Sequence, residues 1–166
     1  MSLLASKFDI VSVDNPVALA ALAQVLAVTG GVTFNAEGTP IAGTIPAGAI
    51  VTMDHTTGAA IVAATPDISA ANKELTFVVI DGNKDLSGSF VQKLTVLQGG
   101  FTMLTDQYDA DAFTPGLPVT FGVGAAGKVS LMTNRATQQL LGFVGPAGLD
   151  SVNGVLQVIV PQGCGL

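Results

Sequence analysis

Charged residues are scarce in this sequence. Of its 166 residues, 6 are basic and 12 are acidic, which makes 11% charged residues and a net charge of −6, whereas a typical soluble domain is about 25% charged. The six basic residues are spread along the chain and do not form the cluster that phosphate contacts require. We therefore expect no nucleic-acid partner. Because 49% of the residues are hydrophobic, the lack of charge does not indicate disorder.

The residue types that most often carry catalysis are also few. Cys164 is the only cysteine, which excludes an internal disulfide, and His55 is the only histidine. Cys164 lies between two glycines with no neighbouring base, and Asp54 would point away from His55 in an extended strand. We therefore predict no catalytic residue, no cofactor and no enzymatic activity.

Long hydrophobic runs are absent as well. The longest uncharged apolar run near the N-terminus is Val17–Val28, interrupted by Gln24, whereas a membrane-spanning helix needs about 20 residues. A secretory signal would fit this length, but the preceding segment carries Lys7, Asp9 and Asp14 and so has no net positive charge. We expect a structural helix here and no membrane partner.

This run has the flanking residues of a short helix. Asn15 can cap it, Pro16 fits the first helical position, and Gly30 or Gly31 can end it. A helix that is apolar nearly all round is buried inside a fold or against another chain. Residues 1–31 are thus predicted to form this helix and an arm, a short strand or extended segment at 7–13. The predicted assembly surface consists of Val17, Leu19, Leu22, Val25 and Leu26.

Residues 32–166 change to short runs of β-branched and aromatic residues, separated by clusters of Gly, Pro, Asn and Asp. Their spacing is typical of a small β-barrel or sandwich, so the predicted fold is mainly β with one short helix. The predicted strands are Ile50–Met53, Ile61–Ala63, Leu75–Ile80, Phe90–Leu97, Phe101–Leu104, Val119–Phe121, Val129–Met132, Leu140–Val144 and Val155–Val160.

Two parts of this β region are similar to each other, at about 44–99 and 113–163. Aligning Val51 with Val119 places Gly48 on Gly116, three residues earlier in each case. Further along, the segment 94–99 aligns with 158–163. The pattern predicts two similar hairpin units packed on each other, and chance similarity between hairpins is the alternative.

Three groups of residues have the spacing of ligand sites. Asp81 and Asp85 begin a segment like a calcium loop, but Leu86 stands where its turn needs glycine. Asp106, Asp109 and Asp111 form a second acidic group, and the sequence leaves open whether either group binds a cation. The segment 122–127 has the glycine spacing of a dinucleotide-binding loop, but a strand follows instead of a helix. We predict a hairpin turn there and no metal site elsewhere.

The order Ile-Pro-Ala-Gly-Ala-Ile-Val-Thr-Met-Asp at 45–54, a glycine-containing turn, and Ala-Ile-Val-Ala-Ala at 60–64 resembles small capsid decoration (cement) proteins of tailed bacteriophages. The runs at 118–121 and 141–144 are similar to later strands of that family, and the resemblance spans about 44–163. It implies a non-enzymatic virion protein on the capsid surface, a dimer or trimer that bridges copies of the major capsid protein.

Two other classes of function are compatible with the same composition. A phage tail-tube or head-closure subunit would also be β-rich, poor in charge and oligomeric. A carbohydrate-binding β module would use exposed aromatic residues or calcium, but the chain has no Trp and a single Tyr, at position 108.

Overall fold

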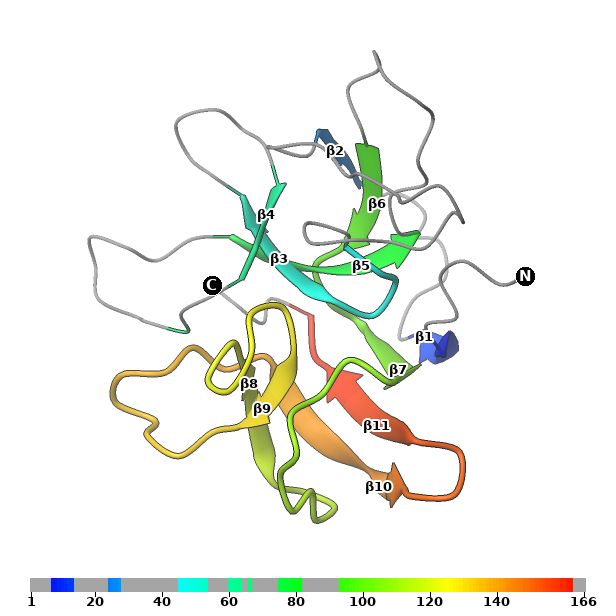
Figure 1. Ribbon diagram of the computed structural model, residues 1–166, viewed down its shortest axis with the longest axis vertical. Coiled ribbons are helices and arrows are strands. Elements are labelled where there is room, and N and C mark those ends of the chain that lie inside the picture. The colour runs from blue at the N-terminus through cyan, green and yellow to red at the C-terminus, as the bar shows by residue number, and fades with distance from the viewer. Residues whose placement is uncertain are drawn as a thin grey trace, which may run out of the picture.

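The structure, a computed structural model, describes residues 7–13, 24–27, 45–53, 60–63, 66, 75–81 and 93–162. Within these residues the regular structure consists of strands, arranged in two antiparallel sheets (Figure 1). The strands are β1 (Phe8–Val13), β2 (Gln24–Ala27), β3 (Ile50–Met53), β4 (Ala60–Val62), β5 (Thr76–Asp81), β6 (Lys93–Leu97), β7 (Phe101–Thr105), β8 (Pro118–Phe121), β9 (Val129–Leu131), β10 (Gly142–Asp150) and β11 (Val155–Val160).

The mainly β prediction is confirmed. Of the predicted barrel or sandwich, the closed barrel is not formed by the described strands, which make two separate sheets. The six-stranded sheet has the order β1-β7-β11-β10-β8-β9, and the five-stranded sheet has the order β2-β6-β5-β3-β4. The chain leaves β6 of one sheet and enters β7 of the other through Gly99 and Gly100. A Cβ on Gly99 would lie 2.3 Å from the carbonyl oxygen of Pro161, so this close crossing requires glycine.

The predicted helix at 17–28 is not confirmed, and part of the prediction is wrong. Residues 24–27 form β2, which pairs with β6, and the rest of the run lies outside the described residues. Backbone pairing with a neighbouring strand outweighs the helical pattern, which is a weak signal in a short segment. The described residues contain no helix long and apolar enough to cross a membrane.

The two sheets share one strand order. The strands of the five-stranded sheet follow one another in the order β2, β6, β5, β3 and β4. Their equivalents in the six-stranded sheet are, in the same order, β7, β11, β10, β8 and β9, and β1 is added at one edge. The residue registers agree as well. Val78 of β5 pairs with Leu97 of β6, and at the equivalent position of the other sheet Phe143 of β10 pairs with Ile159 of β11.

The turns that enter β3 and β8 are also alike. Gly48 and Gly116 have φ angles of 84° and 86°, in the left-handed region that favours glycine. The Gly48 amide donates to Val79 at 2.7 Å, and the Gly116 amide donates to Val144 at 2.9 Å. The register thus places Gly48 on Gly116, as in the sequence alignment. The register also places Val96 on Val158, whereas the sequence alignment of 94–99 with 158–163 placed Leu94 there. The sequence alignment was therefore wrong by two residues in this segment.

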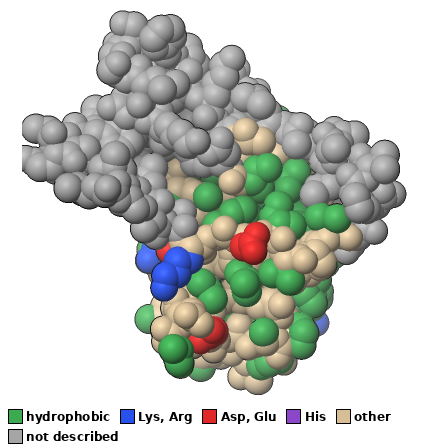
Figure 2. Space-filling model, turned by 90° about the vertical axis from the view of Figure 1, so that its right-hand side faces the viewer, with side chains coloured by type: hydrophobic (Ala, Val, Ile, Leu, Met, Phe, Trp, Pro, Cys, Tyr) green, Lys and Arg blue, Asp and Glu red, His purple; other side chains and the backbone are tan. Residues whose placement is uncertain are grey.

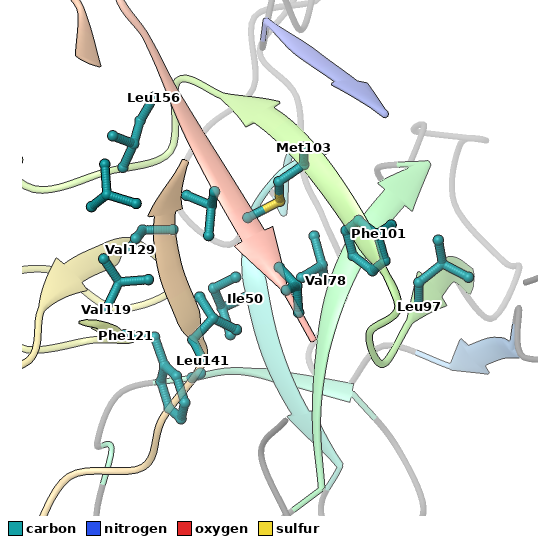
Figure 3. Close-up of a cluster of buried hydrophobic side chains, with 14 of the residues drawn as sticks. Ile50, Val78, Leu97, Phe101, Met103, Val119, Phe121, Val129, Leu141 and Leu156 are labelled. Atoms are coloured by element: carbon teal, nitrogen blue, oxygen red, sulfur yellow. The ribbon is translucent and has the colours of Figure 1, made fainter. Parts of the chain in front are cut away.

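The main core lies between the two sheets (Figure 3). Ile50, Val78 and Leu97 of the five-stranded sheet are 0–1% exposed and pack with the inner face of the six-stranded sheet. That inner face contributes Phe101, Met103, Val119, Phe121, Val129, Val144, Leu156, Val158 and Val160.

A second cluster of buried side chains belongs to the five-stranded sheet. It contains Val51, Phe77, Val79 and Val96, each at most 1% exposed. Because neighbouring residues of a strand point to opposite faces, these side chains lie on the face away from the main core. Both faces of the five-stranded sheet are therefore buried.

Candidate functional site

The structure does not assemble the predicted helical surface. Val17, Leu19 and Leu22 lie outside the described residues, whereas Val25 and Leu26 belong to β2 and pair with Thr95 and Leu94 of β6. A strand repeats every two residues instead of every 3.6. The helical spacing that grouped Val25 and Leu26 therefore does not hold.

Several predicted positions of chemical interest also lie outside the described residues. His55 and Cys164 are among them, as is Asp85 of the first acidic group. Asp81 of that group ends β5.

The carboxylates of the second acidic group bind the chain's own donors. Asp109 accepts hydrogen bonds from the backbone amide of Gly124 at 2.9 Å and from the Ser130 hydroxyl at 2.5 Å. Asp111 accepts one from the backbone amide of Leu131 at 2.9 Å. Both carboxylates thereby attach the loop after β7 to the β8–β9 hairpin.

Asp106 has a similar role at the other end of this loop. Its carboxylate accepts the backbone amide of Lys7 at 2.8 Å and the side-chain amide of Gln107 at 2.7 Å. The Lys7 ammonium group donates to the carbonyl oxygen of Asn153. Across the described part of the chain, no group of three or more His, Cys, Asp or Glu side chains could hold a metal ion.

We expect Asp109→Ala to destabilise the protein by about 1–3 kcal/mol, because the Gly124 amide and the Ser130 hydroxyl lose a charged acceptor. Urea denaturation measures this loss. Asp9→Ala, which removes an exposed carboxylate from β1, is the matched control and should change the free energy of unfolding by less than about 0.5 kcal/mol. Equal effects of the two substitutions would contradict the assigned role of Asp109.

The glycine-rich segment 122–127 joins two antiparallel strands, as predicted, since β8 pairs with β9. Its last residue connects the sheets. The Gly127 amide donates to the carbonyl of Ala63 at 2.7 Å, and its carbonyl accepts the amide of Ile50 at 2.8 Å. Gly127 of the six-stranded sheet therefore bridges Ile50 and Ala63 at the end of the ladder that β3 and β4 form with each other.

Gln139 is a second link between the sheets, and sequence reasoning did not find it. Its side chain is only 4% exposed, and its amide nitrogen donates to the Thr76 hydroxyl at 3.0 Å. The backbone carbonyl of Gln139 accepts the Thr120 hydroxyl at 2.7 Å. A glutamine before a predicted strand carries no signal of burial, because its partners come from distant parts of the chain.

Asp150 organises the turn between β10 and β11. Its carboxylate accepts the backbone amides of Val152 at 2.9 Å and Asn153 at 3.1 Å, and the side-chain amide of Asn153 at 2.6 Å. The hydrogen bond from the Asn153 side chain, followed by those from the backbone and the charge of Lys7, lowers the pKa of Asp150 below its ordinary value.

A lowered pKa in the folded state means that Asp150 stabilises the protein above the ordinary aspartate pKa of about 3.9. This contribution is lost as the pH falls through that value toward the lower folded pKa. We expect Asp150→Asn to destabilise the protein at neutral pH, and the difference from the wild type to shrink under acid conditions. Urea unfolding over a pH series measures it, and a difference that stayed constant would contradict the role of the charge.

Hydrophobic side chains remain on the surface of the described part, among uncharged polar side chains and few charges (Figure 2). Val152 at the tip of the β10–β11 turn is 91% exposed, and Ile159 in the middle of the six-stranded sheet is 37% exposed. The other large exposed hydrophobic residues are Val11, Leu75, Leu117 and Val123.

No protein-family model matches the sequence, and comparisons with curated proteins and with solved structures find no match either.

Proposed function

We propose that this chain is a non-enzymatic structural protein of a tailed-phage particle, a decoration protein that binds the outer shell and bridges copies of the major capsid protein. The observation that carries the proposal is the role of four acidic residues in the described part of the chain. Asp106, Asp109, Asp111 and Asp150 each accept hydrogen bonds from the chain's own backbone. These carboxylates hold loops in place, which favours a role in assembly over one in catalysis.

The resemblance at 45–64 supports the same function. Its first part forms the Gly48 turn and β3, and its second part includes β4, the strand that pairs with β3. A protein of this kind stabilises a shell by burying surface across subunit boundaries. Each 100 Å² of apolar surface removed from water contributes about 2.5 kcal/mol before the costs of association.

Sedimentation with empty shells tests the proposal. Purified protein is mixed with shells assembled without it, and the bound fraction is measured after centrifugation. We expect saturable binding at a fixed ratio to the major capsid protein. Shells that already carry their full complement are the control and should take up no more. Absence of binding to the undecorated shells would overturn the proposal, and binding confined to tails would favour the tail-tube alternative.

A further inference from the structure

The turn between β10 and β11 carries Asn153, the one asparagine of the sequence that a glycine follows. This pair of residues has the chemistry of deamidation, in which the backbone nitrogen of the glycine attacks Cγ of the asparagine side chain. A bond forms between these two atoms, a five-membered ring closes, and ammonia leaves with the proton of the backbone nitrogen. Water then opens the ring to aspartate or isoaspartate. Glycine favours the attack because it has no Cβ to obstruct it, and Asn153 is exposed to water.

Asp150 binds the side chain that this reaction would use. The side-chain amide of Asn153 donates to the Asp150 carboxylate at 2.6 Å. The same carboxylate accepts the backbone amides of Val152 and Asn153, which fixes its own position. The ring closes only when the side chain is free to rotate over the nitrogen of Gly154. That rotation breaks a hydrogen bond to a charged acceptor, which is stronger than one between neutral groups.

The peptide unit between Asn153 and Gly154 is held at both ends. Its N–H donates to the backbone carbonyl of Asp150 at 2.8 Å. Its carbonyl oxygen accepts a hydrogen bond from the Lys7 ammonium group. The two contacts oppose rotation of the peptide, and the contact with Asp150 also retains the proton that the nitrogen must lose before it attacks.

We propose that Asn153 is a deamidation site that the fold keeps closed through its contacts with Asp150. The reaction proceeds when the turn opens, and it leaves a carboxylate at position 153 that has no proton to donate to Asp150. Two like charges then replace a hydrogen bond, and the isoaspartate product also lengthens the backbone of the turn by one methylene group. The modification therefore records that the turn has been open. The inference does not rest on the proposed function, because it concerns only the chemistry of this turn.

Peptide mass spectrometry of the full chain during incubation in mildly alkaline buffer tests the proposal. The fraction of Asn153 converted to aspartate or isoaspartate is followed in the folded wild type and in the wild type unfolded in guanidinium chloride. We expect the folded protein to react at least about tenfold more slowly, since a hydrogen bond to a charged group must break before the attack. This comparison needs no variant, so it decides the proposal even where a substitution prevents folding.

Asp150→Ala removes the acceptor and should raise the rate in the folded protein by about tenfold for the same reason. Asp109→Ala is the matched control, because it removes a hydrogen-bonded carboxylate from the same sheet without touching the turn. Circular dichroism verifies that both variants are folded. A control that reacted as fast as Asp150→Ala would assign the effect to overall stability and overturn the proposal. Equal rates in the folded and unfolded wild type, or no reaction at Asn153 in the unfolded chain, would overturn it too.

Discussion

Replacing Gly127 with valine is expected to destabilise the protein by about 2–5 kcal/mol, the sum of left-handed backbone strain and overpacking. Gly127 has a φ angle of 76°, and a Cβ at this position would lie 2.7 Å from Cγ1 of Val62. Its amide and carbonyl also bind Ala63 and Ile50. The substitution therefore affects the backbone connection between the sheets as well as local packing.

Gly116→Val separates these two effects. Gly116 has a similar φ angle of 86°, but a Cβ there would meet no atom within 4 Å. Only the backbone strain remains, so the expected loss is about 1–2 kcal/mol. Urea denaturation of both variants gives the two free energies of unfolding. Equal losses would show that Gly127 does not hold the sheets together.

Replacing Phe101 with alanine is expected to cost about 3–5 kcal/mol, because it leaves a cavity in a close-packed core. Phe101 is 1% exposed and lies in the cluster to which both sheets contribute. It is also the first residue of β7, directly after the crossing at 99–100. The cavity would therefore form where the chain changes sheets.

Leu117→Ala is the control for this prediction. Leu117 is 40% exposed, so its truncation removes less buried surface and should cost about 1 kcal/mol or less. Thermal and urea unfolding of the wild type and both variants measure the difference. A Phe101→Ala variant as stable as Leu117→Ala would contradict the view that one core joins the two sheets.

The strands could be predicted from the sequence because short β-branched runs between turn residues depend mostly on local pattern. All nine predicted runs contain strand residues, and the arm at 7–13 contains β1. The division into two sheets could not be predicted, because it depends on contacts such as that of Gly99 with Pro161. The helix prediction was wrong at 24–27 for a related reason, since the strand that pairs with these residues, β6, lies 66 to 72 positions later in the chain.

The candidate site was harder to predict than the fold. The acidic residues at 106, 109 and 111 attract attention as possible ligands in the sequence, whereas the structure shows that they bind backbone amides and neighbouring side chains. The row formed by Thr102, Ile159 and Phe143 across the six-stranded sheet had no signal either, because these residues are far apart in the chain. Only the register of β7, β10 and β11 brings them into one row.

Counting copies of this chain in purified virions tests most directly our proposal that it is a decoration protein of a phage shell. Quantitative mass spectrometry gives the ratio of this chain to the major capsid protein. We predict a simple ratio, with hundreds of copies per particle, as expected for a protein repeated over the shell surface. Tens of copies would assign the chain to the tail or neck, and its absence from the particle would contradict the account.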